Sequence, residues 1–72
     1  MLEQMGKSLQ TGDTFTSDNG ETWYMITGAH PLMNHTTKQI TYRARQVNSQ
    51  GAPMSGDKLI TLKYEEVVIV KI

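Results

Sequence analysis

The chain has 72 residues, with seven basic and seven acidic side chains and no cysteine. That length allows one domain whose hydrophobic core is only just sufficient, and without cysteine neither a disulfide nor a thiolate–metal site can reinforce it. The zero net charge argues against a strongly electrostatic nucleic-acid binder, and the lack of a long apolar run favours a soluble cytoplasmic protein (host cytoplasm, if viral) over a membrane protein.

The first eight residues give the weakest structural signal. Leu2, Met5 and Leu9 follow the spacing of a helix, but Gly6 interrupts the pattern. We therefore predict an N-terminal arm over residues 1–8, partly disordered or forming one helical turn. A single small β domain is predicted over residues 9–72.

The strongest local signal is a β-hairpin. Asn19-Gly20 lies between a short predicted strand ending at Thr16 and a run of strand-forming residues from Glu21 to Thr27. Both turn residues tolerate a positive φ, and Asn-Gly between two such runs is typical of a tight hairpin. The carboxylate of Asp18 can accept hydrogen bonds from backbone amides of the same turn.

A longer pattern surrounds that turn and consists of Thr16, Asp18, Gly20, Thr22 and Trp23 at fixed spacing. It resembles the Asp-box, a hairpin motif of sialidase propeller blades and of some microbial ribonucleases. The resemblance implies a structural turn with an inward-facing tryptophan, usually remote from the chemistry. A sialidase repeats the box across several blades, whereas this chain carries one copy and is too short for a propeller. We assign no family.

Three more strands are predicted beyond the hairpin, separated by two loops. Residues 28–37 form the first loop, because glycine, proline and asparagine punctuate them. Residues 38–47 alternate strictly, with Ile40, Tyr42 and Ala44 on the predicted inner face. Residues 48–57 are rich in glycine and serine and form the second loop, which is followed by strands over residues 58–64 and 67–72.

Five short strands predict an all-β fold, either a small antiparallel SH3-like barrel or a strongly bent sheet. An OB-like barrel is the alternative. An OB-fold usually has a helix between its third and fourth strands, and residues 48–57 are poor helix formers. This difference favours the SH3-like barrel.

The last predicted strand is apolar on both faces, with Lys71 as its single polar residue. A strand with one face in water normally carries a polar face. One interpretation is a barrel-closing strand that the N-terminal arm covers. The other is a surface that binds another protein, or a second copy in a homodimer, by strand addition. The sequence leaves both open.

Both loops place apolar side chains next to proline. Leu32 and Met33 follow Pro31, and Met54 follows Pro53. These side chains either fold back to plug the open ends of the barrel or bind a partner. With the outer face of the last strand, they give the predicted protein-binding residues: Leu32, Met33, Val68, Val70 and Ile72.

Catalytic chemistry has little support in the sequence. His30 and His35 lie in one predicted loop, where an acid–base pair is conceivable, but a zinc site needs three or four ligands. No serine or threonine lies in a recognisable nucleophile motif, and there is no glycine-rich phosphate loop. We predict no catalytic, metal-binding or cofactor-binding residues and a protein that is not an enzyme.

Two functions remain. The first is a non-catalytic protein-binding module: an adaptor, an assembly part or a small inhibitor that docks on a larger protein, such as an accessory protein encoded by a bacteriophage. The alternative is a small nucleic-acid-binding barrel with a basic face around Arg43 and Arg45. The predicted residues of that face are Lys38, Arg43, Arg45, Lys58 and Lys63.

Overall fold

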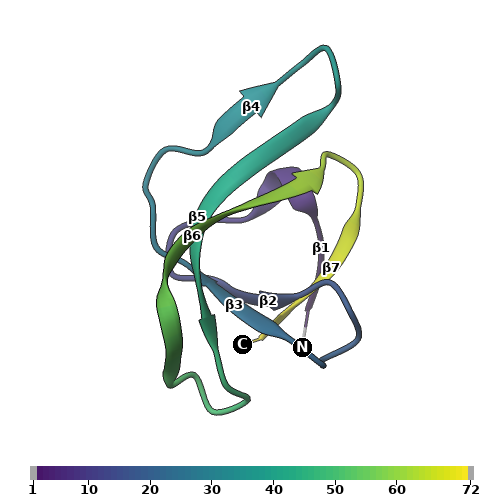
Figure 1. The fold of residues 1–72 in the computed structure, drawn as a ribbon. Helices are drawn as coiled ribbons and strands as arrows, with labels where there is room; N and C mark the ends of the chain where they lie inside the picture. Colours follow the sequence, from purple (N-terminus) through teal and green to yellow (C-terminus); the bar gives the residue numbers. More distant parts are fainter. Residues whose placement is uncertain (1, 72) are drawn as a thin grey trace.

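The computed structural model describes residues 2–71 as an antiparallel sheet of seven strands with one short 3-10 helix. In chain order these are β1 (Leu2–Met5), η1 (Gly6–Ser8), β2 (Thr14–Thr16), β3 (Trp23–Ile26), β4 (Leu32–Asn34), β5 (Gln39–Val47), β6 (Pro53–Lys63) and β7 (Val67–Lys71). The strands follow the order β1-β7-β2-β3-β5-β4, and β6 pairs with β5. The sheet curls into a half-barrel (Figure 1), which confirms the predicted all-β, strongly bent antiparallel fold.

All five predicted strands are present, and two more were missed. β4 lies inside the region predicted as the first loop, where it pairs with the start of β5. β1 lies inside the predicted arm. β6 begins at Pro53, so the second loop is shorter than the sequence indicated.

Where an arm that is partly disordered or forms one helical turn was predicted, the structure has a strand, β1, followed by the 3-10 turn η1. β1 pairs with β7 from Leu2 opposite Val70 to Met5 opposite Val67. η1 then crosses to the end of β6, where the amide of Gly6 donates to the carbonyl of Glu66 at 2.7 Å. A Cβ at position 6 would clash with the carbonyl oxygen of Lys63, so this crossing depends on glycine.

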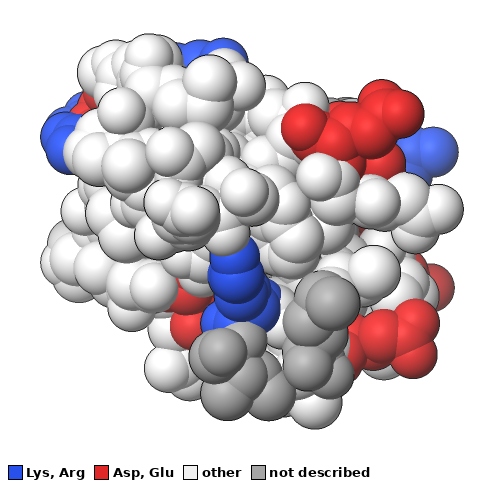
Figure 2. Space-filling view, turned by 90° about the horizontal axis from the view of Figure 1, so that it is seen from below, with Lys and Arg blue, Asp and Glu red and all other residues white. Residues whose placement is uncertain are grey.

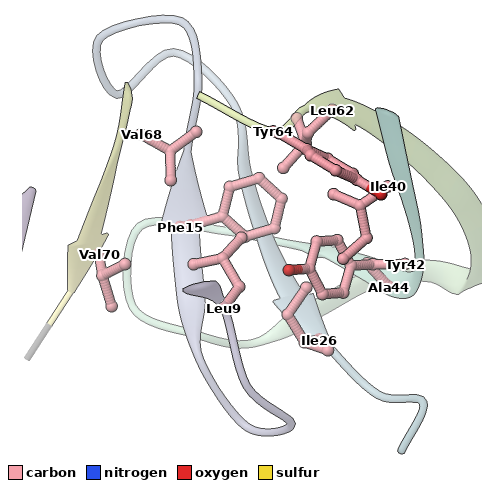
Figure 3. Packing of buried hydrophobic residues seen from close by; sticks show 10 residues of the cluster. All are labelled: Leu9, Phe15, Ile26, Ile40, Tyr42, Ala44, Leu62, Tyr64, Val68 and Val70. Carbon is pink, nitrogen blue, oxygen red and sulfur yellow. The ribbon is translucent and has the colours of Figure 1, made fainter. Parts of the chain in front are cut away.

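The core lies inside the curl of the sheet, with the fully buried Phe15 among its members (Figure 3). The predicted inner face of β5 is buried as expected, and every strand except β1 and β4 contributes to the cluster. The hydroxyl of Tyr42 donates to the carbonyl of Gly6 at 2.6 Å and so ties η1 to the core. Burial raises the pKa of that phenol. The cluster consists of Leu9, Phe15, Ile26, Ile40, Tyr42, Ala44, Leu62, Tyr64, Val68 and Val70.

β7 is an interior strand, and this corrects the predicted partner surface. Val68 and Val70 are 1% and 7% exposed, because their side chains pack in the core. They are therefore not available to a partner. β1 and β2 occupy the two edges of β7, so strand addition there would first require one of them to leave. Ile72, the third residue of that predicted surface, lies outside the described residues.

The hairpin between β2 and β3 has the predicted turn. Asn19 and Gly20 have φ values of 63° and 92°. The carboxylate of Asp18 accepts hydrogen bonds from the amide of Thr22 at 2.9 Å and from the hydroxyl of Thr16 at 2.7 Å. These two bonds, the Thr22 amide first, lower the pKa of Asp18. Trp23 is buried, as the Asp-box resemblance implied.

Candidate protein interface

β6 is a long edge strand. It has 11 residues and pairs with β5 alone, so its other edge has no strand partner within residues 2–71. From Pro53 to Leu59 every side chain is exposed, and burial begins only at Ile60. Unpaired edges of this length normally carry some form of protection, or they bind another chain.

The direction of the backbone groups along β6 follows from one hydrogen bond. The amide of Tyr64 donates to the carbonyl of Lys38 at 2.9 Å, so residue 64 turns its amide toward β5. In an antiparallel pair this direction alternates, so Asp57, Leu59 and Thr61 turn their amides and carbonyls to the open edge. The next residue with this orientation is Lys63, whose backbone groups already have partners. Its amide donates to the carboxylate of Glu66, and its carbonyl accepts from the amide of Glu66.

The outer face of β4, β5 and β6 carries two exposed leucines beside that edge. Leu32 pairs with Thr41, and Thr41 pairs with Thr61, so these three side chains share one face. The two threonine hydroxyls lie 2.9 Å apart. One step along, Leu59 lies opposite Arg43. Leu32 and Leu59 are 68% and 62% exposed, although leucine is normally a core residue.

The methionines predicted to plug the barrel or bind a partner also lie at the surface. Met33 pairs with Ile40, yet half of its surface is exposed, because β4 projects beyond the core (Figure 1). Met54 is exposed near the start of β6. With Leu32, these side chains do not close the ends of the barrel, so that interpretation is wrong.

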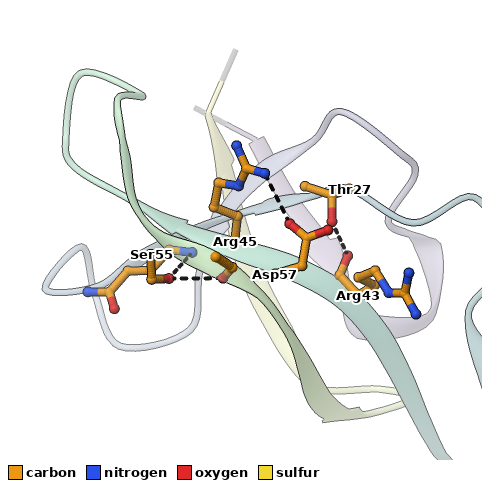
Figure 4. A network of polar contacts seen from close by, with 7 residues as sticks. Thr27, Arg43, Arg45, Ser55 and Asp57 are labelled. Carbon is orange, nitrogen blue, oxygen red and sulfur yellow. Dashed lines mark hydrogen bonds and ion pairs between the residues drawn. The ribbon is translucent and has the colours of Figure 1, made fainter.

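The five basic residues predicted to bind nucleic acid are divided among different places. On the outer face, Arg45 forms an ion pair with Asp57 at 3.3 Å (Figure 4), and Arg43 lies beside Leu59. Lys58 lies over the ring of Tyr24, with its Nζ 5.2 Å from the ring centroid. The remaining two, Lys38 and Lys63, lie at the far end of the β5–β6 pair.

The charged side chains are also spread out on the face of the molecule that Figure 2 shows. Seen from below the view of Figure 1, most of the surface is uncharged and the charged side chains form small separate groups (Figure 2). Arg45 and Asp57 are each more than a third exposed, and such a pair contributes little to stability. Arg43 and Arg45 therefore share the outer face of β5, while Lys58 lies over Tyr24, and nucleic-acid binding by these residues stays a prediction.

The two histidines lie in different surroundings. Nδ1 of His35 lies 3.1 Å from the hydroxyl of Tyr64, while His30 lies in the segment before β4. Across residues 2–71, no three His, Asp or Glu side chains come close enough to hold a metal ion. In that same part of the chain, no helix has the length and apolar character needed to cross a bilayer.

Compared with protein-family models, with curated proteins and with solved structures, the chain gives no match.

Proposed function

We propose that this protein is a non-catalytic protein-binding module that holds an extended segment of another protein as an added strand on β6. The observation that carries the proposal is the open edge of β6, where Asp57, Leu59 and Thr61 direct their amides and carbonyls away from β5. An added strand would satisfy these groups with regular hydrogen bonds, which supply affinity regardless of the partner's side chains.

Side chains next to the edge would supply the specificity. Leu59 lies on the outer face directly beside the position of an added strand, and it is largely exposed in the isolated chain. A partner residue adjacent to Leu59 would bury apolar surface if it were apolar too. The expected partner segment is therefore extended and carries apolar side chains at alternate positions.

Several features of β6 oppose pairing with a second copy of itself. Pro53 has no amide to donate, and Lys58 places a charge near the middle of the strand. The bulge between Arg45 and Val47 twists the β5–β6 pair. Natural edge strands use these devices to avoid self-association. We therefore expect light scattering at low and high salt to give the mass of a monomer. A salt-insensitive dimer would instead place a second copy on this edge.

Proline substitution tests the role of the edge. Leu59→Pro removes an amide that points outward and leaves the hydrogen bonds between β6 and β5 in place. A library of displayed random peptides would be selected on the wild-type protein, and the selected peptides would be tested on Leu59→Pro. We expect alternating apolar sequences to be enriched, and their binding to be lost in the variant while its melting temperature stays close to the wild-type value.

Two control variants make the result specific. Leu59→Ala keeps the outward amide and should weaken peptide binding without abolishing it. Arg43→Glu combined with Arg45→Glu should leave peptide binding intact, whereas a nucleic-acid-binding barrel would lose oligonucleotide retention. Selected peptides that bind Leu59→Pro as well as the wild type would contradict strand addition.

A further inference from the structure

A second candidate site lies where β5 begins and β6 ends, at the end of this strand pair that is far from the loop joining the two strands. A pocket of about 540 Å³ is lined by residues of η1, of the β4–β5 turn and of the end of β6. Its volume is in the range of small-molecule sites. The lining includes Lys7, Thr37, Lys38, Lys63, Tyr64 and Glu65.

The charge of this pocket is unbalanced. Three lysines from three separate segments of the chain line it, against the single carboxylate of Glu65. None of the three forms an ion pair within residues 2–71, where Arg45 with Asp57 is the only pair within 4.0 Å. In a chain whose net charge is zero, three lysines against one carboxylate around one hollow create a local positive potential.

The backbone of Tyr64 fixes the three lysines relative to one another. Its carbonyl accepts a hydrogen bond from the amide of Lys7 at 3.2 Å, and its amide donates to the carbonyl of Lys38 at 2.9 Å. Lys63 is its neighbour in the chain. The backbones of the three lysines are therefore linked through one residue, which gives an anion site a rigid frame.

The turn that carries Lys38 is also held firmly. The side-chain oxygen of Asn34 accepts hydrogen bonds from the amides of Thr36 and Thr37 at 3.1 and 3.2 Å. Lys38 itself has a φ of 57°, a conformation that glycine or asparagine adopts at lower cost. A lysine at this strained position is consistent with a role for its ammonium group in binding.

We infer that this pocket binds a compact anion that contains linked phosphate groups. Lysine ammonium groups are common phosphate ligands, and the hydroxyl of Thr37 adds a neutral donor at the same rim. Three cations fit a chain of phosphates better than a single one, because each added phosphate brings further negative charge. The site is separate from the open edge of β6, so the two functions stand or fall independently.

Calorimetry with tripolyphosphate and with ATP, at constant ionic strength, tests this inference. We expect saturable binding to the wild type. Lys7→Gln, Lys63→Gln and Lys38→Gly should each weaken it by about three- to tenfold, and the triple variant should abolish it. Lys38→Gly also suits the positive φ, so its melting temperature should not fall. Equal affinity for both probes would assign recognition to the phosphates alone, and tighter binding of ATP would add a contact to the base.

The matched control is Lys58→Gln, which removes the same charge outside the pocket. It should leave the affinity for tripolyphosphate unchanged. Two results would overturn the inference: no saturable binding of either probe to the wild type, or an equal loss of affinity in Lys58→Gln, which would mean general attraction to any surface lysine. Peptide binding at the β6 edge should be unaffected in all these variants.

Discussion

Two apolar side chains on strands of the same sheet have opposite environments. Val68 on β7 is buried in the core, between the paired strands β1 and β2, whereas Leu59 on β6 is largely exposed beside an open edge. The closed region, made of β1, β7, β2 and β3, uses its apolar residues to bury Phe15. The open region, made of β4, β6 and the outer face of β5, leaves apolar residues in water. The apolar side chains of the closed region stabilise the core, whereas the exposed ones of the open region are those we propose to contact a partner.

The largest expected difference between the closed and the open region comes from two substitutions to alanine, one in each region. Phe15→Ala should lower the free energy of unfolding by about 3–5 kcal/mol, because it opens a cavity in the centre of the core. Such a loss is comparable to the whole stability of many small domains. Leu59→Ala should change it by less than about 0.5 kcal/mol. Urea denaturation followed by Trp23 fluorescence measures both. Similar losses in the two variants would remove the distinction between the regions.

Substituting two glycines should give a smaller difference in the free energy of unfolding. Gly6→Ala should lower the free energy of unfolding by about 1–3 kcal/mol, since the new methyl group would press on the backbone carbonyl of Lys63. Gly56→Ala in β6 meets nothing within 4 Å and should lie within about 0.5 kcal/mol of the wild type. Thermal unfolding distinguishes them, and an unchanged melting temperature in Gly6→Ala would mean that η1 is not clamped against β6.

Acid should weaken the hairpin of the closed region. Hydrogen bonds from the Thr22 amide and the Thr16 hydroxyl lower the pKa of Asp18 below its ordinary value of 3.8. The carboxylate therefore stabilises the fold at every pH above that value, and this contribution is lost as the pH falls from 3.8 through the folded pKa. Asp18→Asn should show a smaller drop in melting temperature on acidification than the wild type. Glu21→Gln, a change in the same turn, should behave like the wild type.

The smallest expected effect is an alternation of amide exchange rates along β6, which NMR can measure residue by residue. The amides of Ile60 and Leu62 face β5 and should exchange slowly, while those of Leu59 and Thr61 face the open edge and should exchange quickly. Uniform protection along the strand would show that another chain already occupies the edge.

The sequence predicted those parts of the structure that depend on local pattern. Strict alternation in β5 placed Ile40, Tyr42 and Ala44 in the core, and Asn19-Gly20 specified the hairpin turn. β4 was not predicted because none of its residues is buried, so its sequence shows no alternation of apolar and polar residues. β1 was missed because Leu2 and Met5 mimic helical spacing, and only pairing with β7 reveals the strand.

The candidate sites were less predictable, because they depend on which edges and segments meet. The apolar character of Val68 and Val70 correctly marked an unusual strand, but it could not tell a covered surface from a binding one. The strand with an unpaired edge is β6 instead. Its sequence looked polar because it contains Asp57 and Lys58, so it was not predicted as a binding strand. Likewise, Lys7 was assigned to an arm, and nothing local connects it with Lys38 and Lys63.

The pairing of β1 with β7 also has a consequence for the order of folding. Leu2 lies opposite Val70, so this contact spans almost the whole described chain, whereas the β5–β6 hairpin joins neighbouring segments. Closing so long a loop costs more entropy and slows the step. On a ribosome, β1 would emerge early and wait without a partner until β7 is synthesised. The hairpin with the open edge would form before the core is complete, so nascent chains would expose β6, the strand that we propose binds a partner, before β1 and β7 pair.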